Sequence, residues 1–124
     1  MTRPEQIAAA VDEVHRCFGR LDILVNNAGV LRDDATLQPL EQTLDCWRET
    51  FDTNLFAVVE VTRAFLPLLR AAGEARIVNV LSQLASMAWN LDPTSPIYDF
   101  KIPAYDVSKT TVNAWTLHLG VELQ

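Results

Sequence analysis

The chain has few glycines and few cysteines, and both shortages narrow the functions that its sequence supports. Only 4 of its 124 residues are glycine, and none of them forms the closely spaced set of a glycine-rich phosphate-binding loop. Cys17 and Cys46 belong to no CxxC pattern or Cys/His cluster, so we expect two reduced thiols rather than a zinc site. The sequence therefore predicts no metal centre.

Basic residues and long apolar runs are also scarce. Lys and Arg total 10 against 16 Asp and Glu, and the formal net charge is −6. A nucleic-acid surface needs a basic patch or stripe, so we predict no nucleic-acid partner. No apolar run approaches the ~20 residues that span a bilayer, and the N-terminal residues lack the apolar segment of a secretory signal. We therefore expect no membrane partner and a cytoplasmic location.

Helical periodicity is present in three segments. The first predicted helix has Thr2 as its N-cap, tolerates Pro4 in its first turn and ends at Gly19. Apolar residues at roughly helical spacing predict one long helix over residues 43–72 and a last helix over 104–124.

Two short apolar runs separate these helices. Residues 21–25 and 76–81 are almost continuously apolar, which predicts strands buried on both faces of a parallel sheet. Residues 82–103 contain several prolines and no sustained period, which predicts an ordered loop. The order helix, strand, helix, strand, helix, with parallel strands joined through a helix, predicts an α/β fold.

Tyr105 and Lys109 lie four residues apart at the start of the last predicted helix, so they share one face. A cation near a phenol favours the phenolate and lowers a pKa that is about 10 when unperturbed, so such a phenol can exchange a proton near neutral pH. Alone, the spacing is common in helices where both residues only pack or contact solvent. We reject the pair Tyr98 and Lys101 for this role, because no helix fixes its geometry.

Three further motifs precede this pair in a fixed order. They are LDILVNNAG at 21–29, DTN at 52–54 and RIVNVLS at 76–82, and the pair itself stands in a fourth motif, YDVSK at 105–109. Together they resemble the short-chain dehydrogenase/reductase family over nearly the whole chain, and the long separation of the last two resembles its carbonyl-reductase-like branch. The resemblance implies a partial Rossmann-like, doubly wound fold in a single partial domain over residues 1–124. The glycine-rich N-terminal half and the C-terminal strands of the family are then absent.

The same resemblance implies an NAD(P)-dependent oxidoreductase that transfers a hydride between the nicotinamide of NAD or NADP and a small carbonyl or alcohol substrate. Tyr105 would be the acid/base, and Lys109 would bind the nicotinamide ribose and favour the phenolate. Ser82, with Ser86 as the alternative, would hydrogen-bond the substrate oxygen. Asn54 would distort the long helix and hold a water of a proton relay, unless it is an ordinary surface asparagine.

The NNAG segment has two open interpretations. By resemblance, Asn26, Ala28 and Gly29 lie along the cofactor near its nucleotide and ribose. The alternative is a tight turn after a strand, in which Gly29 supplies an unusual φ/ψ combination. The two interpretations do not exclude each other.

The missing glycine-rich loop keeps other hypotheses open. The chain is alternatively a truncated, non-catalytic relative that acts as a helix-mediated interaction module, or the product of an incomplete gene model. In the family the long helix and the last helix mediate dimerisation, so the resemblance implies a homodimer through them. Substrate identity and the choice between NAD and NADP are not predicted.

Overall fold

The computed structural model describes residues 3–124, in which helices precede, separate and follow two strands. The elements are α1 (Pro4–Phe18), β1 (Ile23–Asn26), α2 (Leu44–Phe51), α3 (Ala57–Ala71), β2 (Arg76–Asn79), α4 (Met87–Leu91) and α5 (Pro103–Glu122). The predicted order of long helices and strands is confirmed, and α4 is an addition to it. The predicted cap Thr2 lies outside the described residues. Gly19 ends α1 in the left-handed region with φ of 68°, which glycine adopts without a steric penalty.

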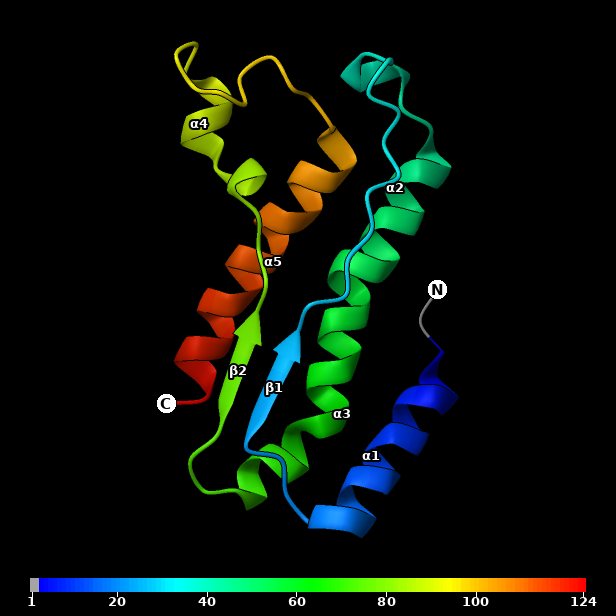
Figure 1. The fold of residues 1–124 in the computed structure, drawn as a ribbon, viewed down its shortest axis with the longest axis vertical. Coiled ribbons are helices and arrows are strands. Elements are labelled where there is room, and N and C mark those ends of the chain that lie inside the picture. The colour runs from blue at the N-terminus through cyan, green and yellow to red at the C-terminus, as the bar shows by residue number, and fades with distance from the viewer. Residues whose placement is uncertain (1–2) are drawn as a thin grey trace.

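The two strands form a parallel pair. Leu24 lies opposite Ile77, and Asn26 lies opposite Asn79. Figure 1 shows α3 and α5 behind the strands and α1 beside α3. Both strand arrows point toward the end of the molecule that carries α4 and the start of α5 (Figure 1). The predicted α/β fold with parallel strands is therefore confirmed, and its strand ends converge where ligands collect in such sheets.

The strands are not buried on both faces, so that prediction is wrong. Leu24 is 9% exposed, whereas its neighbours Ile23 and Val25 are 59% and 54% exposed, and Val78 on β2 is 46% exposed. Within residues 3–124 the helices cover one face of the sheet, and alternate side chains of each strand point to the uncovered face.

The covered face holds the apolar core that fixes the strands. Leu24 packs with Phe65, Leu68 and Leu69 of α3. Partly buried side chains of α1, α3 and β2 complete this cluster, among them Val11, Val14, Val61 and Ile77. No helix within residues 3–124 combines the length and the apolar character needed to cross a membrane.

The predicted long helix is continuous but locally distorted. Thr43 caps α2, its hydroxyl accepting a hydrogen bond from Cys46 N. Residues 52–56 between α2 and α3 are π-helical, and Ala57 N donates to Asp52 O, five residues earlier. π-Helical turns inside α-helices are frequent at functional sites. This turn contains Asn54 and confirms the helix distortion expected there.

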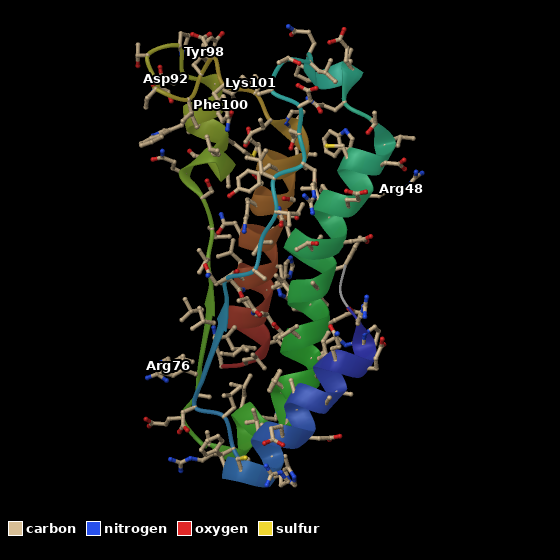
Figure 2. All side chains as sticks on the ribbon, turned by 45° about the vertical axis from the view of Figure 1, so that its right-hand side comes forward. Arg48, Arg76, Asp92, Tyr98, Phe100 and Lys101 are labelled. Atoms are coloured by element: carbon tan, nitrogen blue, oxygen red, sulfur yellow. The ribbon has the colours of Figure 1, made fainter. Side chains whose placement is uncertain are left out.

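The segment between β2 and α5 is ordered, but it is not only a loop. Ser86 caps the short helix α4, which at five residues is too short to show a period in the sequence. Figure 2 shows Tyr98, Phe100 and Lys101 gathered at one end of the molecule, remote from Arg76. Lys101 Nζ lies 5.3 Å from the Tyr98 ring centroid and donates to Asn90 O and Oδ1 at 3.0 and 3.1 Å. These contacts hold the segment together.

Candidate active site

Residues from three segments of the chain, the loop after β1, the segment after β2 and the start of α5, meet beyond the strand ends. A cavity of about 380 Å³ lies there, a volume typical of small-molecule sites, and its walls include Gly29, Val80, Leu84, Tyr105 and Lys109. A hollow of similar volume, about 390 Å³, lies between α1 and α3, but it holds no comparable set of groups for proton transfer. Chemistry rather than size therefore identifies the site.

Tyr105 and Lys109 approach each other on one face of α5, as their spacing predicts. Lys109 Nζ lies 5.8 Å from the centroid of the Tyr105 ring. Lys109 is only 5% exposed, and burial lowers its pKa. Its ammonium donates to Val80 O at 3.3 Å, the one acceptor that the described residues give its three N–H groups. The remaining donors are available to a ligand in the cavity.

Asn54 is completely buried, so the interpretation as a surface asparagine is wrong. Its Oδ1 accepts from Val30 N at 2.7 Å, and its Nδ2 donates to Val30 O at 2.9 Å and to Ser108 Oγ at 3.0 Å. The side chain thus joins the π-helical turn to the loop after β1 and to α5. Both of those segments line the cavity.

Gly29 is required by a close approach rather than by its backbone angles. Its φ lies outside the positive region, so the predicted unusual conformation is not found. A Cβ at this position would lie 3.1 Å from Lys109 Nζ and 3.4 Å from Asn54 Oδ1. A side chain at this position would crowd the ammonium, and glycine leaves room for Lys109 beside the loop.

Asn26 and Ala28 lie outside the cavity wall. Asn26 Nδ2 donates to Thr62 Oγ1 at 3.2 Å and to Asn79 Oδ1 at 2.8 Å, and Asn79 Nδ2 donates to Thr116 Oγ1 at 2.9 Å. This chain of polar side chains joins α3, both strands and α5. Ala28 is exposed at the strand end. The contact of both residues with a cofactor stays a prediction.

Ser82 lies three residues beyond the end of β2 and is not part of the cavity wall, although Leu81 and Leu84 on either side of it are. Its Oγ accepts from Leu84 N at 3.1 Å and caps the 3₁₀ turn Gln83–Ala85. The hydroxyl hydrogen has no acceptor within residues 3–124. The alternative, Ser86, caps α4 in the same way, and within residues 3–124 neither serine forms a hydrogen bond with Tyr105.

Sequence reasoning missed two buried acids near the start of α5, Asp33 and Asp106. Asp33 accepts from the backbone of this helix, although it lies 71 residues away from Ala104. Asp106 Oδ1 has no hydrogen-bond partner among the described residues. Burial first, and the charge of Asp33 second, raise the pKa of Asp106 to about 6, while Lys101 opposes the shift.

The raised pKa of Asp106 gives a prediction for stability. The folded state holds this proton more tightly than the unfolded state, whose pKa is near 3.8. The stabilisation that the protonated Asp106 carboxyl gives the folded state is therefore complete below about pH 4. It is lost as the pH rises toward 6, and it is absent above pH 6. We expect Asp106→Asn to raise the free energy of unfolding at pH 7 by about 1 kcal/mol and to leave it unchanged near pH 4. Urea unfolding at both pH values measures this, and an equal change at both would contradict it.

The whole chain, residues 1–124, matches the family model described as short chain dehydrogenase. The short-chain dehydrogenase anuI from Penicillium roqueforti is 42% identical over 118 residues, covering 91% of this chain and 45% of the relative. The KRED1-Pglu enzyme superposes with a TM-score of 0.77 at 30% identity, covering 97% of this chain and 45% of its own. A short-chain dehydrogenase/reductase of unknown function from Caenorhabditis elegans, solved with cofactor, has a TM-score of 0.78 at 28% identity, covering 96% and 41%. The chain thus spans less than half the length of these relatives.

Proposed function

Because this chain belongs to the short-chain dehydrogenase family, a family of oxidoreductases, we propose that it carries the proton-transfer and nicotinamide-binding part of an NAD(P)-dependent carbonyl/alcohol oxidoreductase. The observation that carries the proposal is the contact of the Tyr105 ring with the buried Lys109 ammonium, 5.8 Å apart, at the edge of the cavity. A phenol beside a desolvated cation is suited to acid/base catalysis.

Each side chain then has one task. In the direction of reduction, the carbonyl oxygen gains a proton as its carbon gains a hydride, and Tyr105 donates the proton. Ser82 donates its free hydroxyl hydrogen to the same oxygen and stabilises the charge that develops there. The Lys109 ammonium stabilises the phenolate left on Tyr105. Asn54, in the π-helical turn, holds a water molecule of the relay through which Tyr105 regains a proton from solvent.

The residues present fit the nicotinamide end of a dinucleotide. Lys109 has N–H donors without an acceptor in the described residues, and ribose hydroxyls are suitable acceptors. Gly29 adds no Cβ to the space beside this ammonium. When bound, NAD or NADP supplies or accepts the hydride. The glycine-rich loop for the pyrophosphate is not among these 124 residues, so we assign the nicotinamide end alone to this chain.

We further propose a cytoplasmic homodimer that acts on a small-molecule substrate. Exposed apolar side chains on the long helical segment and on α5 support pairing through these helices, as in Phe56 (54% exposed), Leu117 (69%) and Val121 (73%). Burying such side chains against a second copy would remove apolar area from water.

Cofactor titration tests the proposal against the rival interaction module. We expect the protein, at the full length its gene encodes, to quench or shift the fluorescence of NADH or NADPH in a saturable way. Lys109→Met should weaken the affinity about tenfold, because charge-assisted hydrogen bonds to the ribose are lost. Lys101→Met, at the only other lysine of the chain, should bind as the unchanged protein does. A folded dimer that binds neither cofactor would support the rival.

A further inference from the structure

We propose that Asp33 is a positioning residue for Tyr105. Its carboxylate fixes the first turn of α5, and the loop that carries it walls the cavity, so Asp33 sets the place of Tyr105 relative to that loop. The inference rests on the proposed function of Tyr105 and adds a residue to its support.

The backbone donors at the start of α5 have few partners of their own. The N-cap residue Ile102 provides no side-chain hydrogen bond, and Pro103 has no N–H. The amides of Ala104 and Tyr105 therefore remain without a partner inside the helix. Asp33 accepts from both of them, with Oδ2 at 2.9 Å from Ala104 N and Oδ1 at 2.9 Å from Tyr105 N. The same carboxylate thus holds the backbone nitrogen of the proposed acid/base.

The loop that carries Asp33 is itself held on both sides of it. Before Asp33, the backbone N–H and C=O of Val30 both bond to the Asn54 side chain. After it, Gln42 bonds to the backbone of Asp34, accepting from its N at 3.0 Å and donating to its O at 2.7 Å. A carboxylate on a loop fixed at two points is a rigid support. Val30 and Leu31 of this loop line the cavity, so Asp33 joins two of its walls.

The Asp33 carboxylate keeps this position despite repulsion from a second acid, Asp106. Asp33 and Asp106 are both only 9% exposed, and the charge of Asp33 disfavours ionisation of Asp106. Two charge-assisted amide bonds and the positive end of the α5 dipole offset this repulsion. An uncharged capping side chain with one acceptor oxygen would accept from one amide without repelling Asp106. The two oxygens of the carboxylate accept from the amides of Ala104 and Tyr105 at once.

Steady-state kinetics on the full-length protein test the inference. We expect Asp33→Ala to lower kcat between about 10-fold and 100-fold, because a small misplacement of a catalytic group is costly. Asp33→Asn keeps one acceptor oxygen, so its kcat should lie between the kcat of Asp33→Ala and that of the unchanged protein. The matched control is Asp34→Ala, since among the described residues the exposed Asp34 carboxylate bonds only to Thr36 of its own loop. This control should leave kcat unchanged.

A double-mutant cycle separates positioning from a merely structural role. If Asp33 acts through Tyr105, then Asp33→Ala has no further effect on the residual single-turnover rate of Tyr105→Phe. The same fold loss in both backgrounds would overturn the inference, and so would a kcat for Asp33→Ala equal to that of Asp34→Ala. Where Asp33→Ala does not fold, Asp33→Asn carries the same cycle. Undiminished activity of Tyr105→Phe alone would instead overturn the proposed function.

Discussion

Replacing Tyr105 with phenylalanine is expected to lower kcat for carbonyl reduction about 1000-fold, within the range that general acid catalysis contributes. The phenylalanine keeps the aromatic ring over Lys109 and removes only the hydroxyl that donates the proton. Cofactor affinity and the free energy of unfolding should therefore stay close to those of the unchanged protein. Initial rates of NADH or NADPH oxidation with the full-length protein and a panel of ketones and aldehydes measure the effect.

Tyr98 provides a matched control for this substitution, because it is the only other tyrosine of the chain and also lies near a lysine, Lys101. It lies in the segment before α5 (Figure 2) and is not among the residues that line the cavity. Tyr98→Phe should retain at least half of the activity. Equal losses in the two variants would show that the effect is not specific to Tyr105.

Replacing Asn54 with alanine is expected to lower the free energy of unfolding by about 3 kcal/mol or more. Three hydrogen bonds are lost, and the partly buried Val30 amide and carbonyl keep no partner in exchange, at a cost of up to about 1–3 kcal/mol for each unsatisfied group. Turnover should fall with stability, because the loop that lines the cavity loses its attachment to the π-helical turn. Urea unfolding and initial rates measure both quantities.

Asn113→Ala is the control for this second substitution, since Asn113 is an exposed asparagine in α5. Its free energy of unfolding should change by less than about 0.5 kcal/mol. A similar small change for Asn54→Ala would contradict the role that its burial and hydrogen bonds indicate.

Local patterns in the sequence predicted the part of the site that one helix carries. Tyr105 and Lys109 meet because residues four apart share a helix face, and no distant segment is needed to bring them together. The distortion at Asn54 was expected from the resemblance of its motif, and the π-helical turn is found there. The parallel pairing of the strands also followed from their order and their apolar runs.

Long-range contacts could not be predicted in the same way. Asp33 looks like a polar loop residue in the sequence, and its contact with Ala104 joins residues 71 positions apart. The pairing of Asn26 with Asn79 depends on strand register, although an asparagine at the same place in both strands was a usable signal. The prediction that the strands are buried on both faces was wrong. An apolar run indicates that a strand can pack against other segments, but it does not indicate which segments cover it.

The uncovered face of the sheet is consistent with the share of the relatives that this chain spans, 45% of anuI and 45% of KRED1-Pglu. The geometry of Tyr105, Lys109 and Asn54 is a property of this chain, and the activity that we propose is that of the whole protein. The experiments on catalysis, on Asp106 and on Asn54 therefore use the protein at the full length that its gene encodes.

Transfer of deuterium from the cofactor to a carbonyl substrate is a direct test of proton donation by Tyr105. The full-length protein is incubated with nicotinamide cofactor deuterated at the hydride position and with a carbonyl panel, and the products are read by mass spectrometry. We predict deuterium on the carbinol carbon of at least one product, with formation reduced about 1000-fold in Tyr105→Phe and no more than about twofold in Tyr98→Phe. A folded, cofactor-binding protein that transfers no deuterium, or that transfers it equally well without the Tyr105 hydroxyl, would contradict the account.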